Sequence, residues 1–145
     1  MPVERTAEIA ASPETIWTYL GQLERWPEWD ADIKSISDVQ GGLVEGGSFM
    51  LHMEGVSVPI TIKDLKEQQG FRWVGLAMCG CLTCEGVFQL QVLGNQRTNL
   101  EYSFGLGSCL GCVLSTVKRK EIVTGTEVGL ANIKKFTEEI EASKS

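Results

Sequence analysis

Apolar and polar residues alternate through the middle of the chain, and this alternation predicts a run of β-strands. Residues 3–10 alternate in part and predict a first strand. Between about 33 and 106, six further segments are separated by breaks rich in Gly, Asn or Gln, which predicts an antiparallel meander. The alternation places four sets of residues on one apolar face: Phe49, Leu51 and Met53; Val58, Ile60 and Ile62; Phe88, Leu90 and Val92; and Leu100, Tyr102 and Phe104.

Two short helices are predicted between the first strand and the meander. Residues 11–23 fit a helix, because Ser12 can cap it and Pro13 suits its first position. Its apolar face is formed by Ile16, Leu20 and Leu23. A second short helix is predicted over 25–33, with its start limited by Pro27.

A long helix is predicted after Gly107, ending at about residue 142. Its inward stripe consists of Val113, Val117, Val123, Leu130, Ile133, Phe136 and Ile140. Gly125 and Gly129 have the spacing of a contact motif of membrane helices, but the charged residues around them exclude a bilayer span. We therefore expect the two glycines to let the helix pack closely on the sheet. The last residues, 141–145, are expected to be frayed.

Composition narrows the class of protein. The 145 residues, 43% of them apolar, fit a single domain over 1–145. The net charge of −6 and the lack of a basic stripe disfavour nucleic acid as a partner. Neither a signal pattern nor an apolar run of roughly 18 residues is present, so we expect a cytoplasmic protein with no membrane span. These features carry no signal for an oligomeric state.

The order of predicted elements, the segment 11–36 (ASPETIWTYLGQLERWPEWDADIKSI) and the segment 129–139 (GLANIKKFTEE) together resemble a known superfamily. It is the START-like helix-grip superfamily, in particular its polyketide cyclase/dehydrase and lipid-transport-like branch. The resemblance covers almost the whole chain. It implies an α+β fold in which a curved antiparallel sheet of about seven strands wraps around a long C-terminal helix, with a cavity between them. This scaffold hosts carriers, cyclases, hydrolases, ligand receptors and co-chaperones, so the fold alone does not specify a function.

The implied cavity gives the apolar face a candidate role as the binding site for a small hydrophobic or amphipathic ligand. Its predicted lining is Phe49, Leu51, Met53, Val58, Ile60, Trp73, Phe88, Tyr102 and Phe104. The alternative is that these side chains fill one another's space as an ordinary core. The resemblance places Trp26 and Trp29 near the cavity mouth, where one of them could gate a ligand, but packing under the sheet is the favoured role.

Candidate catalytic groups are few, so the sequence favours a non-enzymatic carrier over an enzyme. Relatives often carry a histidine at the position of Gly86, and the single histidine, His52, falls in the outward phase. The enzyme alternative is a cyclase- or dehydrase-like protein in which Tyr102 moves protons, assisted by Asp30 or Asp32 at the cavity mouth.

All five cysteines lie between 79 and 112, and antiparallel strand order predicts that they converge at one end of the sheet. They are Cys79, Cys81, Cys84, Cys109 and Cys112. Three or four convergent thiolates suit zinc or an iron–sulfur cluster. Two other interpretations stay open: free thiols, some of them buried, and a redox disulfide.

Overall fold

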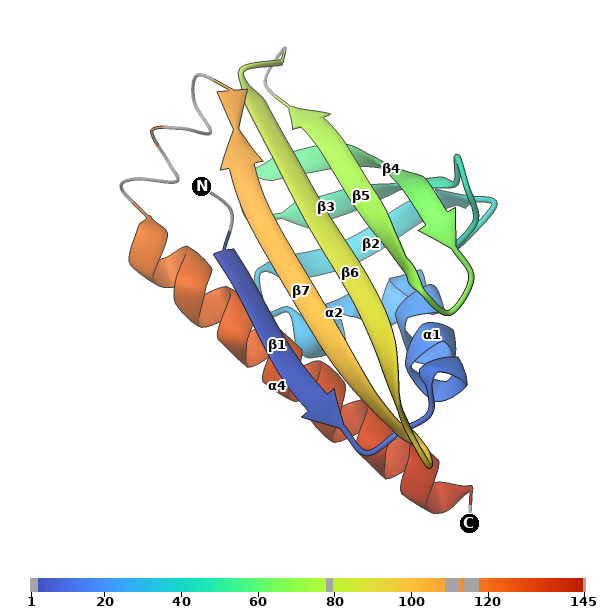
Figure 1. The fold of residues 1–145 in the computed structure, drawn as a ribbon. Helices are drawn as coiled ribbons and strands as arrows, with labels where there is room; N and C mark the ends of the chain where they lie inside the picture. Colours follow the sequence, from blue (N-terminus) through green and yellow to red (C-terminus); the bar gives the residue numbers. More distant parts are fainter. Residues whose placement is uncertain (1–2, 78–79, 109–112, 114–117, 145) are drawn as a thin grey trace.

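A seven-stranded antiparallel sheet curves over one long helix in the computed structural model, which describes residues 3–77, 80–108, 113 and 118–144 (Figure 1). The strand order is β1-β7-β6-β5-β4-β3-β2, so the chain forms a meander from β2 to β7 and β1 joins at the β7 edge. The strands are β1 (Val3–Ile9), β2 (Ile33–Gln40), β3 (Ser48–Met53), β4 (Val56–Lys66), β5 (Gly70–Ala77), β6 (Leu82–Gly94) and β7 (Arg97–Gly107). The predicted fold class is confirmed.

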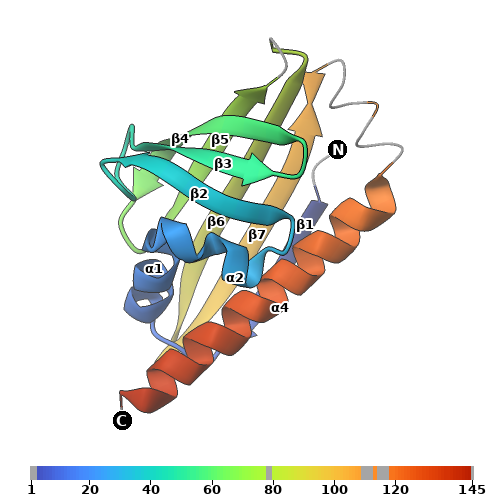
Figure 2. The ribbon, with the colours of Figure 1, turned by 180° about the vertical axis from the view of Figure 1, so that it is seen from behind.

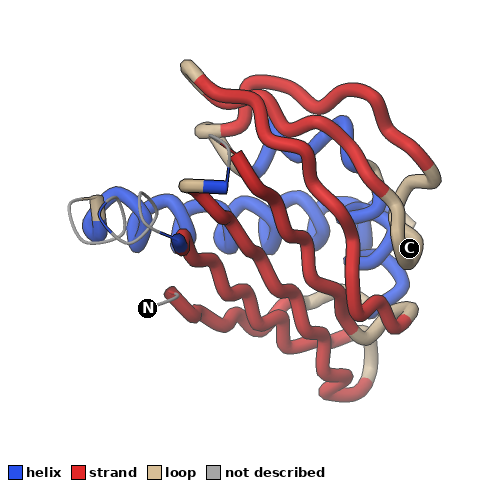
Figure 3. Tube along the Cα trace, turned by 90° about the horizontal axis from the view of Figure 1, so that it is seen from above, coloured by secondary structure: helices blue, strands red, loops and turns tan. Residues whose placement is uncertain are grey.

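The helices lie over the concave face of the sheet, as the view from behind shows (Figure 2). They are α1 (Pro13–Gly21), the 3-10 helix η1 (Leu23–Arg25), α2 (Trp26–Trp29) and α4 (Arg119–Ser143). Ser12 caps α1 as predicted, since its Oγ accepts a hydrogen bond from the Thr15 N–H at 3.2 Å. From above, the sheet is seen to curve around α4 (Figure 3). The region between the sheet and α4 is called the interior below.

The apolar stripe of α4 is shorter than the sequence predicts. The helix begins at Arg119, so Val113 precedes it, and 57% of the surface of Val113 is exposed. Val117 lies outside the described residues. Leu130 and Ile133 are buried. Val123, Phe136 and Ile140 are half-buried. No helix among the residues that the structure describes is long and apolar enough to cross a bilayer.

The two helix glycines face α2 and the residues after it, which corrects the expectation that they pack on the sheet. A Cβ added to Gly129 would lie 3.3 Å from Trp29 Cε3, and one added to Gly125 would lie 3.5 Å from Asp32 Oδ2. Asn132 Nδ2 also donates a hydrogen bond to the Trp29 carbonyl at 3.3 Å. The lack of side chains at these positions therefore lets α4 approach Trp29 closely.

The C-terminal end of α4 is held in place rather than frayed. Glu141 Oε1 accepts hydrogen bonds from the Ser12 N–H at 2.7 Å and from Thr15 Oγ1 at 2.9 Å. Glu138 Oε2 accepts one from the Ala10 N–H at 2.7 Å, and Lys144 Nζ donates to Thr15 Oγ1 at 2.7 Å. We call Glu138, Glu141 and Lys144 the C-terminal anchor, because they join the end of α4 to the start of α1.

One strand residue also departs from its predicted phase. Val92 was expected to share the buried face of Phe88 and Leu90, but 61% of its surface is exposed. The last four residues of β6 are all exposed, and the pairing of β6 with β7 becomes irregular between Val92 and Gly94. Alternation therefore does not predict burial at the end of this strand.

Candidate ligand-binding site in the interior

The predicted lining residues come together on the concave face of the sheet. Seven of the nine are buried, with at most 3% of their surface exposed: Phe49, Leu51, Val58, Ile60, Trp73, Phe88 and Tyr102. Met53 and Phe104 are half-buried and pack against the same core. They come from five consecutive strands, β3 to β7, whose antiparallel register aligns their inward positions. Whether they enclose a ligand stays a prediction.

Aromatic rings fill much of the interior. The Trp26 ring lies at the centre, with centroid distances of 5.3 Å to Phe49, 5.4 Å to Trp29 and 5.6 Å to Trp73. Phe88 and Tyr102 stack at 4.4 Å. Edge-to-face and offset arrangements of this kind are the favoured ones for aromatic pairs. Trp26 and Trp29 are 0% and 1% exposed, so both are packed inside, in agreement with the role favoured for them; whether one of them gates a ligand stays a prediction.

Gly86 makes room for the Trp73 ring. Trp73 on β5 pairs with Gly86 on β6, and Gly86 pairs with Phe104 on β7. The indole extends across Gly86 and lies 5.7 Å from the Phe104 ring, so an added Cβ would overlap Trp73 atoms Cε2, Nε1 and Cζ2. Trp73 therefore covers the position at which the resemblance suggests a histidine in relatives. A glycine inside a strand is a signal for such close approach.

The three interior tryptophans differ in how their N–H groups are paired. Trp26 Nε1 donates a hydrogen bond to the Leu20 carbonyl at 2.9 Å. The Nε1 atoms of Trp29 and Trp73 are also buried, but neither has a hydrogen-bond partner among the described residues. Buried polar groups without a partner are rare in folded proteins, so each calls for an explanation, as does Arg72 Nε on the outer face. Sequence patterns gave no indication of this difference.

Of the polar candidates, Tyr102 is buried in the interior and Asp30, which is half-buried, lies at its border. Burial raises the pKa of Asp30 to about 6, although the Asp32 N–H donates to Asp30 Oδ1 at 3.0 Å and opposes that rise. Burial raises the pKa of Tyr102 well above its usual value, and the charges of Asp30 and Cys84 raise it further. Asp32, the third predicted residue, is exposed. Asp30 is therefore the group best placed to exchange a proton near neutral pH.

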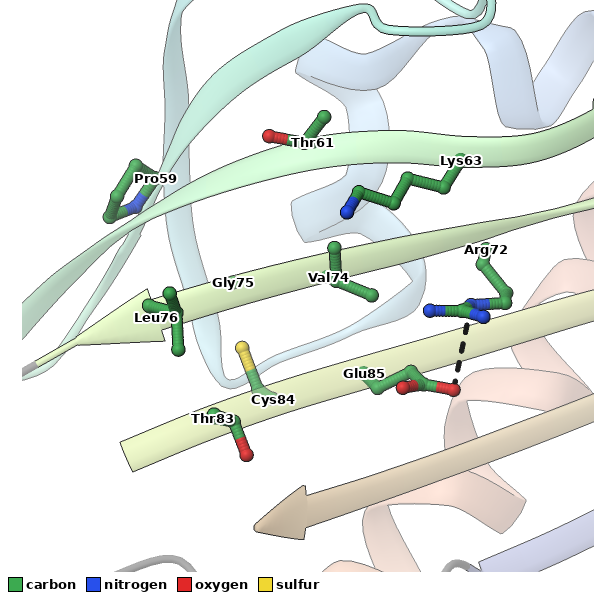
Figure 4. Close-up of a pocket in the computed structure, with 10 residues that line it drawn as sticks. All are labelled: Pro59, Thr61, Lys63, Arg72, Val74, Gly75, Leu76, Thr83, Cys84 and Glu85. Atoms are coloured by element: carbon green, nitrogen blue, oxygen red, sulfur yellow. Dashed lines mark ion pairs between the residues drawn. The ribbon is translucent and has the colours of Figure 1, made fainter. Parts of the chain in front are cut away.

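Two pockets that the sequence did not predict lie on the opposite, outer face of the sheet. The first, of about 530 Å³, spans β4, β5 and β6 (Figure 4). Its lining residues are Pro59, Thr61, Lys63, Arg72, Val74, Gly75, Leu76, Thr83, Cys84 and Glu85. The second, of about 470 Å³, adjoins it at Arg72. Arg72 is paired with Asp64 at 3.0 Å and with Glu85 at 3.7 Å, so its charge is already neutralised.

His52 lies on the outer face and is half-buried rather than exposed. Serines on the two neighbouring strands enclose its ring: Ser37 Oγ lies 2.6 Å from Nε2 and Ser57 Oγ lies 2.7 Å from Nδ1. The outward phase predicted from Leu51 and Met53 is therefore correct, and the cross-strand serines account for the extra burial. His52 is not available to the interior.

The cysteine hypothesis falls largely on residues that the structure does not describe. Cys79, Cys109 and Cys112 lie outside the described residues. Cys81 is exposed, whereas Cys84 is buried and its pKa is raised to about 11 by burial, which disfavours the thiolate that a metal needs. Among the described residues, no group of three His, Cys, Asp or Glu side chains could hold a metal ion. A zinc, iron–sulfur or disulfide site stays a prediction for elemental analysis and thiol titration to test.

Solved structures share this fold at low sequence identity. A hypothetical protein from Helicobacter pylori has a TM-score of 0.78 and 13% identity, with 94% of this chain and 88% of that chain covered. A START superfamily protein from Mycobacterium smegmatis has a TM-score of 0.68 and 21% identity, with 99% of each chain covered. The di-domain ARO/CYC protein BexL of the BE-7585A biosynthetic pathway has a TM-score of 0.70 and 10% identity, over 92% of this chain and 45% of that chain.

Sequence comparison is more specific than these structural likenesses. A comparison with curated proteins finds no match. A family model described as polyketide cyclase / dehydrase and lipid transport matches residues 2–135, which is nearly the whole chain. This match agrees with the helix-grip resemblance found in the sequence. The chain therefore belongs to the polyketide cyclase/dehydrase and lipid transport family.

Proposed function

We propose that this protein binds a small, largely apolar molecule in the interior, between the concave face of the sheet and α4. The observation that carries the proposal is that two buried indole N–H groups, those of Trp29 and Trp73, have no partner among the described residues. An ordinary core would avoid both, because each unpaired buried donor costs about 1–3 kcal/mol. Membership of a family named for cyclases, dehydrases and lipid transport supports the same function.

The ligand would enter by displacing side chains, since rings occupy the interior in this structure. Trp26 is fixed by its hydrogen bond to Leu20, whereas no hydrogen bond to the described residues holds the indoles of Trp29 and Trp73. Rotation of an indole that has no hydrogen bond to break costs less than rotation of one that has. We therefore infer that Trp29 and Trp73 move when a ligand binds and that Trp26 stays in place.

Native mass spectrometry of freshly purified protein tests this proposal. We expect a non-covalent adduct of small-molecule mass that organic extraction removes. A matched pair of variants then locates it: Phe88→Trp adds volume to the interior, and Val87→Trp adds the same ring type to the outer face one residue earlier. The adduct should be lost in Phe88→Trp and kept in Val87→Trp, with folding of both checked by circular dichroism. Retention in Phe88→Trp together with loss in Val87→Trp would overturn the interior site.

A second candidate function is proton transfer to a bound substrate, as in a cyclase or dehydrase. It is favoured by one observation, the burial of the Asp30 carboxyl, which raises its pKa to about 6 and so into the range useful for acid–base catalysis. Tyr102 lies close enough for the Asp30 charge to raise its pKa. If a substrate is found, turnover should depend on Asp30. Unchanged turnover in both Asp30→Asn and Tyr102→Phe would remove this candidate.

A further inference from the structure

The N–H groups of the interior tryptophans point to a particular chemistry in the ligand. An indole nitrogen can only donate a hydrogen bond. Trp26 has its acceptor in the protein, the Leu20 carbonyl, whereas Trp29 and Trp73 have none among the described residues although they are only 1% and 3% exposed. What these two groups lack among the described residues is therefore an acceptor.

The two unpaired donors belong to one neighbourhood. Both indole rings contact Trp26, at centroid distances of 5.4 Å for Trp29 and 5.6 Å for Trp73. Trp29 packs edge-on against Tyr102 at 5.8 Å, and Trp73 packs against Phe104 at 5.7 Å. Tyr102 and Phe104 are two residues apart on the same face of β7, a separation of about 7 Å. The two indoles therefore border one aromatic cluster around Trp26.

The side chains around the two indoles also limit the shape and the charge of the ligand. The faces and edges of aromatic rings dominate this part of the interior, and flat conjugated molecules pack best against them. A charged group would lose its hydration there without a counter-charge, and an anion would also be repelled by the Asp30 carboxylate. Both conditions favour an uncharged molecule whose acceptor is a carbonyl oxygen.

We propose that Trp29 and Trp73 are the hydrogen-bond donors of the ligand site, and that they select uncharged, flat, conjugated molecules carrying a carbonyl oxygen. This inference rests on the proposed function, because it assumes that a ligand enters the interior. It adds which atoms recognise the ligand and which class of molecule satisfies them. A purely apolar molecule of the same shape would displace the same rings but leave both donors without an acceptor.

Two probes of nearly equal size isolate the carbonyl: 9-fluorenone, a flat ketone, and fluorene, the corresponding hydrocarbon. Binding of each to the ¹⁵N-labelled full chain is followed by the four indole N–H signals, assigned with single Trp→Phe variants. We expect fluorenone to bind about threefold to tenfold more tightly than fluorene. Fluorenone should shift the Trp29 or Trp73 N–H signal downfield, while the Trp26 signal, already hydrogen-bonded, should change least.

Variants that keep an aromatic ring but remove the donor complete the test. Trp29→Phe or Trp73→Phe should reduce the preference for fluorenone to about onefold to threefold. Trp17→Phe serves as the matched control, because Trp17 packs on Phe71 outside the lining set, and it should keep the preference. Equal affinity for the two probes in the native chain, or a preference that survives in both donor variants, would overturn the inference and leave the proposed function standing. Failure of both probes to bind would count against the proposed function itself.

Discussion

The C-terminal anchor and the indoles of Trp29 and Trp73 differ in how their polar groups are paired. At the anchor, the N–H groups of Ala10 and Ser12 and the hydroxyl of Thr15 are paired with carboxylates of α4. In the interior, the N–H groups of Trp29 and Trp73 have no partner among the described residues. The two regions are covered by the same helix, so the difference does not arise from a general lack of acceptors along α4.

The difference in pairing suggests different roles for the two regions. The C-terminal anchor holds α4 on the rest of the fold, whereas we expect the rings of the interior to move when a ligand binds. A paired end resists local unfolding because its opening exposes several hydrogen bonds at once. The Trp29 and Trp73 rings have no hydrogen bond to the described residues to lose when they move, and they gain one when an acceptor enters. The predictions below change one region or the other and are ordered by the size of the expected effect.

The largest effect is expected from Trp26→Phe. This variant tests whether the hydrogen bond of Trp26 makes it contribute more to stability than Trp29 and Trp73 do. It removes buried ring volume and also leaves the Leu20 carbonyl without its partner, so we expect a loss of about 2–4 kcal/mol in the free energy of unfolding. Trp29→Phe and Trp73→Phe remove similar volume together with an unpaired donor, so each should cost about 1–3 kcal/mol less. Urea unfolding of the three variants measures this order, and equal losses in all three would contradict it.

Gly86→Ala is expected to be the next most damaging change. The added methyl group overlaps the Trp73 ring, and overpacking of this kind costs about 1–3 kcal/mol. Combining it with Trp73→Phe should recover part of the loss, because the smaller ring does not extend across position 86. Denaturant unfolding of both single variants and the double variant gives the coupling. Strict additivity would show that Trp73 does not lie over Gly86.

Asp30→Asn should change how stability depends on pH. The pKa of Asp30 is raised in the folded protein to about 6, so the folded state binds the proton more tightly than the unfolded state does. Stability should therefore fall as pH rises from about 4 to about 6, by on the order of 2 kcal/mol. Asp30→Asn removes this fall and should be the more stable protein at pH 7. Asp32→Asn, at an exposed residue, is the control that should keep the fall.

Glu141→Gln should have the smallest effect and the opposite pH dependence. Chiefly the hydrogen bond from the Ser12 N–H holds the pKa of Glu141 below its usual value, so this residue stabilises the fold above about pH 4 and the effect is lost as pH falls further. We expect a loss of about 1 kcal/mol at pH 7 that disappears at acid pH. Glu139→Gln, at an exposed position of the same helix, should cost less at every pH.

Local patterns in the sequence were sufficient to predict the architecture. Period-two alternation identified the strands and their inward faces, and Ser12 followed by Pro13 identified the start of α1, because these signals involve neighbouring residues only. The predicted burial of Val92 and Val113 was wrong, since more than half of each surface is exposed. Alternation and helical spacing give the phase of a residue, but they do not show where its packing against the rest of the molecule stops.

The details of the candidate site depend on contacts between distant residues, so the sequence did not contain a local signal for them. The C-terminal anchor is a similar case outside the site, since the Ser12–Glu141 hydrogen bond joins residues 129 positions apart. The placement of Trp73 over Gly86 requires the register of β5 on β6. The unpaired state of the Trp29 and Trp73 N–H groups depends on every neighbour in the interior. The lining set and the roles of Asp30 and Tyr102 were nevertheless predicted as candidates from strand phase and from the family resemblance.

The central claim is that the ligand binds on the concave face of the sheet and not in the pocket on its outer face. A crystal structure of the protein grown with 9-fluorenone tests it most directly, because it shows which face the ketone occupies. The account predicts the ketone in the interior, against Tyr102 and Phe104, with its oxygen within hydrogen-bond distance of Nε1 of Trp29 or Trp73. Density for the ketone in the outer pocket, against Val74 and Leu76, with the interior rings unmoved, would contradict it.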